Sequence, residues 1–434
     1  MKKYFGTDGI RGKAFEKLNS ELAFKLGQGI SYVFKPDRVV IGMDTRASSP
    51  MLAYSIANGL QAKGVNVLFA GVVSTPMIAY YSLVKNMIGI MITASHNPYT
   101  DNGIKIFKNG YKTYEEDELK IEAFIDHGQL TFGSFGRLIL SDDIEKEYLK
   151  IYKQFNDFKS NLKVIADAAN GANHLIADKL LNHFTNDLAL INIDPDGYNI
   201  NHHCGSTYLN DLPDMVKDNF DIGFSYDGDG DRIIMIDHLG NIFDGDLIIY
   251  TIAKYLKLKG ELKNNKVVLT KMSNPAILKA LRDLGIDYTL TDVGDKYVFK
   301  ALDEENLNVG GESSGHIILN HLLHSGDGLL VSVYILYILN ELQMSLHDFG
   351  YVKPYPIKTH NIKNISKSVL LKPEVLNIIS GHQKEIEALG GMLLVRASGT
   401  EDLIRVTLSV EDGNILNDVS THIVRTLEKE GMKS

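Results

Sequence analysis

A hydroxyl and an imidazole stand side by side at Ser95 and His96, directly after an apolar run over residues 87–92. The run predicts a buried strand, and the small and polar residues that follow cannot continue it. In an open α/β sheet, ligands bind at the carboxyl ends of strands, so this pair is well placed for nucleophilic chemistry. A Ser-His-Asn stretch taken alone more often closes a turn or caps a helix. The interpretation therefore depends on what else the chain contains.

Three carboxylates follow at alternate positions, Asp227, Asp229 and Asp231, in a glycine-rich stretch between two apolar runs. This pattern predicts a tight loop between two strands. Carboxylates packed this closely repel one another, so without a cation one or more would be driven toward protonation. An oxygen-only site with few protein ligands suits Mg²⁺ when a phosphate supplies a further ligand. A calcium EF-hand loop does not fit, because Arg232 and His238 replace its Gly and Glu, and a solvated acidic turn is the other alternative.

Composition limits the classes of protein to which the chain can belong. It has 434 residues, a formal net charge of −9 and 44% hydrophobic residues. These values are typical of a globular protein, and the length suggests about three domains. A nucleic-acid backbone demands broad basic surfaces, so we expect no nucleic-acid partner. Any preference for phosphate must then come from a local pocket.

Several features predict a cytoplasmic protein. The first residues turn polar at once and include no apolar stretch of signal-peptide length. The longest apolar run, residues 329–339, is too short to span a bilayer, so no membrane partner is expected. The single cysteine, Cys204, excludes an internal disulfide and fits a reducing compartment. His202 and His203 adjoin it, but neighbours in sequence point different ways, so a metal site there is not favoured.

A weak internal repeat organises the first three quarters of the chain. Each copy has a β-branched strand that ends in polar residues, then a helical pattern, then a second strand. The first strands cover residues 38–45, 162–169 and 266–273, the helices 50–63, 174–184 and 275–284, and the second strands begin near residues 65, 188 and 288. Three such units predict three α/β domains with largely parallel sheets.

Turn-rich segments indicate where the domains end. They are residues 128–141, 237–240 and 350–356. The predicted domains cover residues 1–135, 143–238, 240–350 and 356–434. In the last domain, two strands over 392–395 and 403–408 and a helix over 414–429 are expected.

Six motifs occur together and in a fixed order. They are residues 6–12, 92–98, 101–105, 227–232, 311–316 and 396–401. With these motifs the chain resembles the α-D-phosphohexomutases, from Lys3 to about Val410. The resemblance implies an α/β fold with three similar α/β domains, mixed and largely parallel sheets, and a smaller C-terminal α+β domain around a central cleft.

Within that family the chain is most similar to bacterial members that act on glucosamine phosphates. The resemblance implies an isomerase, an intramolecular phosphotransferase, that interconverts glucosamine 6-phosphate and glucosamine 1-phosphate and feeds UDP-N-acetylglucosamine and cell-wall precursor synthesis. It implies a phosphoserine at Ser95, one Mg²⁺ per subunit, and glucosamine 1,6-bisphosphate as intermediate and activator. Relatives are often dimers, so a homodimer is expected, although no interface can be recognised in the sequence.

The resemblance also implies roles in the reaction. Ser95 and the three aspartates would hold the metal, and Arg11 would contact the phosphoserine and the sugar. Lys105 would be the general acid or base, with His96 beside it. Without the resemblance, Arg11 fits an exposed turn and Lys105 a solvated cation at the end of a hairpin. An ammonium near Arg11, His96 and the metal should have a lowered pKa.

Two neighbouring segments are expected to support this chemistry. Asp44 and Arg46 follow a strand end and are predicted to brace the Ser95 loop. Residues 294–297 are similar to a family segment near the substrate.

The stretch 311–315 formally matches the G-x-S-x-G nucleophile elbow. An elbow needs a helix after the serine, but residues 316–319 continue as an apolar strand, so we exclude it. A polar loop that contacts sugar hydroxyls through Glu312 and Ser314 fits better. In the family this loop distinguishes sugars, and Ser313 is typical of members that act on glucosamine phosphates.

The loop that begins at Arg396 has the groups that a phosphate monoester requires. It offers a guanidinium, two hydroxyls and a glycine that lets backbone N–H groups approach, and Arg405 can add a second guanidinium. Such a loop alone is often only a hairpin turn, so its role depends on the resemblance. The implied substrate-binding residues are Glu312, Ser314, His316, Arg396, Ser398, Gly399, Thr400 and Arg405.

Three alternative functions are compatible with the same residues. The first is phosphomannomutase or phosphoglucomutase activity, which a kinetic comparison of the sugar phosphates would identify. The second is a metal-dependent sugar phosphatase that hydrolyses the phosphoserine. The third is a non-catalytic sugar-phosphate sensor, which predicts binding without turnover.

Overall fold

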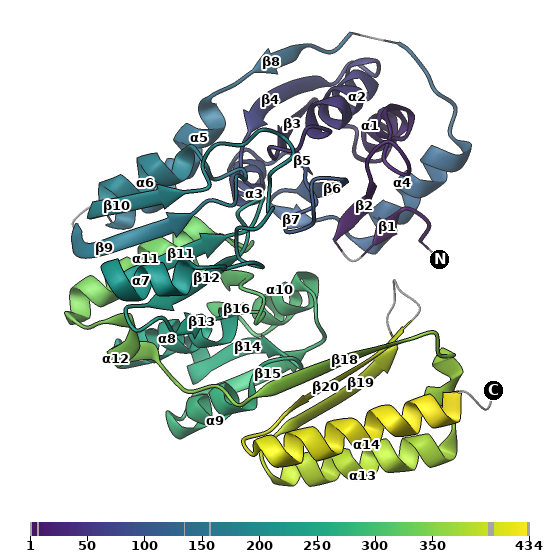
Figure 1. Cartoon of the computed structure of the whole chain (residues 1–434). Coiled ribbons are helices and arrows are strands. Elements are labelled where there is room, and N and C mark those ends of the chain that lie inside the picture. The colour runs from purple at the N-terminus through teal and green to yellow at the C-terminus, as the bar shows by residue number, and fades with distance from the viewer. Residues whose placement is uncertain (1, 7, 134, 156–157, 398–402, 432–434) are drawn as a thin grey trace. The chain divides into compact units, whose positions relative to one another are not determined.

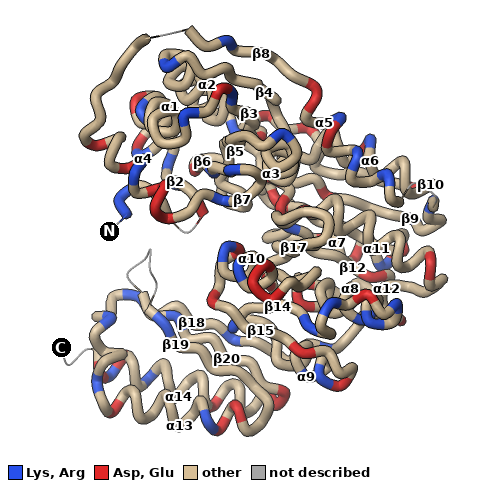
Figure 2. The backbone as a smooth tube through the Cα atoms, turned by 180° about the vertical axis from the view of Figure 1, so that it is seen from behind, with Lys and Arg blue, Asp and Glu red and all other residues tan. Residues whose placement is uncertain are grey.

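The structure is a computed structural model that describes residues 2–6, 8–133, 135–155, 158–397 and 403–431. Its contacts divide the chain into two compact units (Figure 1). One unit runs to Thr270 and resumes over Thr289–Tyr351, and the other contains Lys271–Tyr288 and the chain from Val352 onward. Acidic and basic residues are interspersed within each unit (Figure 2).

The first sheet has eight strands in the order β1-β2-β6-β5-β3-β4-β8, with β7 paired to β6. β3 runs parallel to β4 and β5, whereas β6 is antiparallel to β5 and β2. The carboxyl end of β5 therefore lies well inside the sheet, where open α/β folds bind ligands. The strands are β1 (Phe5–Gly6), β2 (Gly9–Lys13), β3 (Arg38–Met43), β4 (Asn66–Val72), β5 (Ile88–Ile92), β6 (Asp101–Lys108), β7 (Tyr111–Lys112) and β8 (Leu138–Leu140).

Helices cover both faces of this sheet. α1 packs against α2 and α4, and their apolar side chains share one core with Val39 and Ile41 of β3. α3 lies on the opposite face, since a side chain at Gly42 or Gly89 would collide with Ile78 of α3. Alternate strand residues thus face opposite helical layers, as the two-residue period of a strand requires. The helices are α1 (Ser20–Phe34), α2 (Ser49–Gln61), α3 (Thr75–Val84) and α4 (Glu115–His127).

The second sheet has five strands in the order β10-β9-β11-β12-β13. β9 is parallel to β10 and β11, and β11, β12 and β13 form an antiparallel meander. The hairpin between β11 and β12 carries the acidic loop. The elements are α5 (Asp143–Tyr148), a 3₁₀ turn (Leu149–Phe155), β9 (Ser160–Asp167), α6 (Ile176–Phe184), β10 (Thr185–Ile191), α7 (Leu212–Asn219), β11 (Ile222–Tyr226), β12 (Ile233–Asp237) and β13 (Ile242–Phe243).

The third sheet has four strands in the order β15-β14-β16-β17. β14 is parallel to β16, and β16 is antiparallel to β17. Because β17 follows the 311–315 loop directly, the expected strand after this loop is confirmed. The elements are α8 (Gly245–Leu258), a 3₁₀ turn (Lys263–Asn265), β14 (Lys266–Thr270), β15 (Asp287–Thr291), α10 (Asp295–Glu304), β16 (Val309–Gly311), β17 (Ile317–Leu319), α11 (Gly328–Leu342) and α12 (Leu346–Gly350).

The second unit is a small α+β fold. Its antiparallel sheet has the order β18-β20-β19, and α13 and α14 pack on it through one apolar core. The segment that contains α9 belongs to the same unit. The elements are α9 (Pro275–Asp283), β18 (Ile357–Lys363), a 3₁₀ turn (Lys367–Leu371), α13 (Pro373–Ala388), β19 (Met392–Ala397), β20 (Leu403–Ser409) and α14 (Gly413–Gly431).

The predicted fold class, three α/β domains with mixed sheets and a smaller C-terminal α+β domain, is confirmed. The repeat is confirmed as well, because β3-α2-β4, β9-α6-β10 and β14-α9-β15 follow the expected order. Residues 138–140, inside the predicted boundary segment 128–141, form the strand β8, which pairs with β4 of the first sheet. The domain limits stay predictions. No helix in the described ranges is long and apolar enough to cross a membrane.

Candidate active site

Ser95 lies in the loop that follows β5, as predicted from the apolar run. Its side chain is buried, and its backbone has φ of 54°, in the left-handed region. This conformation is unfavourable for a residue with a Cβ atom, and such strain often accompanies function. The Ser95 N–H donates to the Thr93 hydroxyl at 2.9 Å, which helps to hold the turn.

Arg46 is the brace that holds this loop. Its buried guanidinium donates to the carbonyls of Ser95 and Asn97, each at 2.8 Å, to that of Asp101 at 3.0 Å, and to that of Pro98. Asp44 accepts from Arg46 Nε at 2.8 Å and neutralises it. The predicted role of Asp44 and Arg46 in bracing the Ser95 loop is confirmed.

The three aspartates converge, as predicted, in the hairpin between β11 and β12. Asp227, Asp229 and Asp231 are all buried, and one oxygen of each lies within 4.8 Å of the others. Ser95 Oγ donates to Asp227 Oδ2 at 2.6 Å. The hydroxyl from the first domain and the acidic loop from the second therefore share one site, although they are far apart in sequence.

Some carboxylate oxygens of this site accept hydrogen bonds and others do not. Asp229 Oδ1 and Asp231 Oδ1 are buried and have no hydrogen-bond partner within the described part of the chain. Leaving a buried carboxylate oxygen unpaired is costly, so these two atoms point to a missing partner. A small divalent cation with oxygen ligands, such as Mg²⁺, fits this donor set.

Lys105 lies beside the acidic loop but differs from expectation in two ways. It is in the middle of β6, not at the end of a hairpin, and its Nζ lies 2.8 Å from both Asp229 Oδ2 and Asp231 Oδ2. Burial lowers the pKa of Lys105, but Asp229, Asp231 and Asp8 outweigh it, and the net pKa is raised well above its usual range. This direction is opposite to the lowering expected for an ammonium near Arg11, His96 and the metal, because carboxylates of the protein surround the ammonium more closely than its cations do.

Burial also shifts the pKa values of the neighbouring groups. Burial, together with Asp229 and Asp231, raises the pKa of Asp227 well above its usual range, which confirms the expected mutual repulsion of the trio. The Nδ1 atom of His96 lies 3.3 Å from Ser95 Oγ. Burial and the cations Arg232 and Arg11 lower the pKa of His96 to about 4, so the imidazole is neutral at neutral pH.

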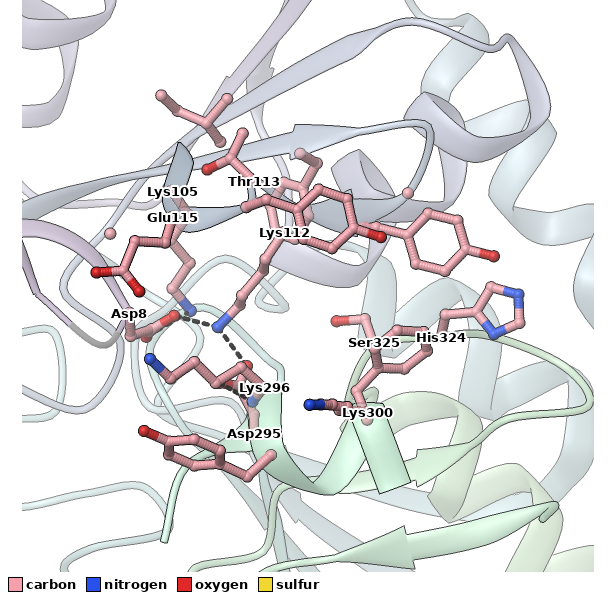
Figure 3. A pocket seen from close by; sticks show the side chains of 18 of the residues that line it. Asp8, Lys105, Lys112, Thr113, Glu115, Asp295, Lys296, Lys300, His324 and Ser325 are labelled. Carbon is pink, nitrogen blue, oxygen red and sulfur yellow. Dashed lines mark hydrogen bonds and ion pairs between the residues drawn. The ribbon is translucent and has the colours of Figure 1, made fainter. Parts of the chain in front are cut away.

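A pocket of about 500 Å³ adjoins this site and shares Lys105 with it (Figure 3). In Figure 3 the ammonium groups of Lys105 and Lys112 point toward Asp8, and Lys112 also meets Asp295 at the start of α10. Arg11 also pairs with Asp8. These ion pairs form a chain of alternating charge from the acidic loop to the third α/β domain.

The predicted sugar loop lies at the same pocket. The carboxylate of Glu312 is buried and accepts from the Gly294 N–H at 2.9 Å, which fixes the start of α10. His316 lines the pocket, and its Nε2 lies 3.9 Å from Asp295. Ser314 is exposed. Residues 294–297, which are expected near the substrate, therefore contact this loop through Gly294, and their role at the substrate stays a prediction.

The predicted phosphate loop belongs to the second unit. Arg396 and Arg405 lie directly opposite each other on β19 and β20, so two guanidinium groups share one stretch of the sheet. Arg405 Nε donates to Asn361 Oδ1 at 2.9 Å. Like charges opposite each other are unfavourable without an anion between them. Ser398, Gly399 and Thr400 lie outside the described residues.

Sequence reasoning missed four polar residues around the site. Thr75 donates to Asp229 of the acidic loop, and Asn201 donates to the Ser95 carbonyl. Asp8 and Lys112 line the pocket. The sequence could have indicated Asp8 as a site residue, because it lies in the glycine-rich motif that contains Arg11. The others are isolated polar residues whose proximity only the fold reveals.

Comparisons with known proteins agree with this geometry. Residues 2–131, 146–240 and 244–352 match the alpha/beta/alpha domains I, II and III of the phosphoglucomutase/phosphomannomutase family. A phosphoglucosamine mutase of Caldicellulosiruptor bescii is 41% identical over 95% of this chain and 96% of its own. A phosphoglucosamine mutase of Bacillus cereus (strain ATCC 10987) is 40% identical over 99% of both chains.

Solved structures show the same fold. A phosphoglucomutase/phosphomannomutase family protein from Burkholderia thailandensis matches with a TM-score of 0.82 at 23% identity, over 98% of this chain and 97% of the other. Aspergillus fumigatus N-acetylphosphoglucosamine mutase, solved with GlcNAc-6P and magnesium, matches with a TM-score of 0.68 at 17% identity, over 99% of this chain and 96% of the other.

The chain therefore belongs to the phosphoglucomutase/phosphomannomutase family, the α-D-phosphohexomutases. It is an isomerase, as the sequence predicts, and its relatives at about 40% identity over nearly the full length are phosphoglucosamine mutases.

Proposed function

We propose that this enzyme acts as a phosphoglucosamine mutase, which interconverts glucosamine 6-phosphate and glucosamine 1-phosphate. The observation that carries the proposal is the contact between Ser95 Oγ and Asp227 Oδ2 at 2.6 Å, in a strained loop beside three buried carboxylates. The choice of sugar is supported by the names of the relatives at 40–41% identity and by Ser313 in the sugar loop.

The three aspartates and Ser95 would hold one Mg²⁺ per subunit. The Oδ1 atoms of Asp229 and Asp231 support this assignment, because these buried oxygen ligands accept no hydrogen bond from the described residues. When bound, the cation would neutralise charge on the phosphoryl group that is transferred.

Ser95 carries the phosphoryl group in the proposed reaction. The free hydroxyl of the sugar monophosphate attacks the phosphorus, a new P–O bond to the sugar forms, and the P–O bond to Ser95 breaks. The product is glucosamine 1,6-bisphosphate, which turns over and returns its other phosphoryl group to Ser95. Positioning and charge stabilisation supply most of the catalysis in such transfers, and Arg11 would contribute a guanidinium.

His96 is better placed than Lys105 to accept the proton of the attacking hydroxyl. Its imidazole is neutral above about pH 4, because burial and nearby cations lower its pKa, and it adjoins Ser95 Oγ at 3.3 Å. Lys105 is held as a cation by carboxylates, so it would stabilise negative charge.

The remaining predicted residues would hold the substrate. Glu312, Ser314 and His316 would contact the sugar hydroxyls, and Arg396, Ser398, Gly399, Thr400 and Arg405 the phosphate that does not react. The opposed guanidinium groups of Arg396 and Arg405 support this, since a dianion between them would relieve their repulsion. We further propose that the enzyme is cytoplasmic and has the four domains predicted from the sequence. We also propose that it forms a homodimer, and light scattering would measure its oligomeric state.

Replacing the nucleophile tests the proposal. Ser95→Ala should abolish isomerisation and leave the thermal midpoint nearly unchanged. Ser82→Ala is the matched control, since the buried Ser82 hydroxyl donates to the Met87 carbonyl and accepts from the Gly110 N–H, near the start of β5, whereas Ser95 follows the end of that strand. Glucosamine, glucose and mannose 6-phosphates should be compared side by side, with the highest kcat/KM expected for glucosamine 6-phosphate.

Three results would contradict the proposal. Retained turnover in Ser95→Ala would remove the covalent mechanism. Steady phosphate release without isomerised product would indicate a phosphatase. A preference for glucose or mannose phosphate would replace the proposed substrate.

A further inference from the structure

The two oxygens of Asp229 have opposite environments. Asp229 Oδ2 accepts a hydrogen bond from the Thr75 hydroxyl at 2.5 Å and another from Lys105 Nζ at 2.8 Å. Asp229 Oδ1 is buried without a partner among the described residues. The carboxylate is therefore fixed in rotation, with one oxygen held by protein donors and the other free.

Thr75 is suited to this task by its place in the fold. It is the first residue of α3, where backbone N–H groups have no partner within the helix. Its N–H donates to the Asp229 carbonyl at 2.9 Å, so Thr75 grips both the backbone and the side chain of one loop residue. The positive end of the helix dipole adds a favourable field for the carboxylate.

This contact joins elements that are distant in sequence. Thr75 belongs to the first sheet's helical layer, and Asp229 to the hairpin of the second sheet. Thr75 is itself fully buried, so water cannot replace its hydroxyl without rearrangement. Lys105 also holds Asp229, but it carries charge, whereas the Thr75 hydroxyl is neutral and acts through orientation alone.

We propose that Thr75 is a positioning residue of the metal site, which holds Asp229 by Oδ2 and thereby presents Oδ1 to the cation. The inference rests on the proposed function, in which the aspartate trio binds a divalent cation. Partners that orient metal-binding carboxylates typically change metal affinity by about 10–100-fold when they are removed. Because Lys105 remains on the same oxygen, we expect the lower end of this range for Thr75.

The test measures Mn²⁺ affinity, and not only activity. Full-length protein stripped with a chelator is titrated with Mn²⁺, and free Mn²⁺ is followed by electron paramagnetic resonance. Thr75→Val keeps the shape of the side chain and removes the hydroxyl, and its Kd should rise about tenfold. Thr75→Ser restores the hydroxyl and should stay within about twofold of the wild-type Kd. Thr75→Ala takes the place of Thr75→Val if that variant does not fold.

Thr251→Val is the matched control. Thr251 is also buried, but its hydroxyl donates to the Leu247 carbonyl of its own helix at 2.8 Å. Thr251→Val should leave the Mn²⁺ affinity unchanged even if it lowers the thermal midpoint. Asp229→Asn should abolish the binding and so locate it at the trio.

The outcomes separate this inference from the proposed function. If the wild-type protein binds Mn²⁺ and Thr75→Val binds it equally well, Thr75 is only a structural residue and the inference is wrong. If the wild-type protein binds none, or if Asp229→Asn binds as well as the wild type, the proposed metal site itself is wrong.

Discussion

Arg46 offers a strong test of how the Ser95 loop is held. Its guanidinium satisfies four carbonyls, those of Ser95, Asn97, Pro98 and Asp101, and its charge is neutralised by Asp44. Removing one partner of a buried ion pair costs about 3–5 kcal/mol, since the other charge stays buried and unpaired. The carbonyls lose charge-assisted hydrogen bonds as well, so we expect Arg46→Met to lower the free energy of unfolding by about 4 kcal/mol.

The assay is urea unfolding of the full chain followed by circular dichroism, because the chain contains no tryptophan. Arg38→Met is the matched control, since Arg38 is exposed at the start of β3 and its loss should cost less than about 0.5 kcal/mol. Arg46→Met should also reduce turnover, because the Ser95 loop loses its anchor. A free energy of unfolding within about 1 kcal/mol of the Arg38→Met value would refute the reasoning.

Two further predictions concern ionisable side chains. Burial raises the pKa of Asp327 to about 7, although hydrogen bonds from the Leu330 N–H and the Tyr148 hydroxyl oppose the shift. The folded protein therefore keeps a proton on Asp327 that the unfolded chain loses near pH 4. Asp327 therefore contributes its full stabilisation below about pH 4, and this contribution to the free energy of unfolding, at most about 4 kcal/mol, is lost as the pH rises to about 7. Asp327→Asn should reduce the difference between the free energies of unfolding measured in urea at pH 5 and pH 8. An unchanged difference would contradict the raised pKa of Asp327. Lys112→Met should lower the free energy of unfolding by about 1–2 kcal/mol, because Asp8 and Asp295 lose their shared, partly exposed partner. The exposed pair of Lys120 with Glu116 is the control, since Lys120→Met should change the urea midpoint little, and equal effects of the two variants would contradict the bridging role of Lys112.

The sequence predicted the elements that position the site because their signals are local. The apolar run before Ser95 and the paired runs around the acidic loop each indicate a strand and its end, and β5, β11 and β12 occur where these runs predict. The brace formed by Asp44 and Arg46 was predictable for the same reason, since both follow the end of β3. Charges at alternate positions predicted the repulsion that, together with the larger effect of burial, raises the pKa of Asp227.

The sequence could not predict which residues from distant segments lie close together in space. The raised pKa of Lys105 depends on Asp229 and Asp231, which are more than a hundred residues away, so the sequence alone indicated the opposite direction. The role of Thr75 could not be predicted either, because a threonine at the start of a helix has many ordinary roles and Asp229 is far away in the sequence. The strand β8 was missed because three exposed residues near glycines resemble a linker more than a sheet edge.

The central claim is that Ser95 carries a phosphoryl group that can be transferred to and from the sugar. The most direct measurement is a single turnover with ³²P-labelled glucosamine 1,6-bisphosphate, followed by peptide mapping and a chase with unlabelled glucosamine 6-phosphate. We predict one label per chain, on the peptide that contains Ser95, and its return to sugar phosphate during the chase. Label on another residue, or label released only as inorganic phosphate, would contradict the claim.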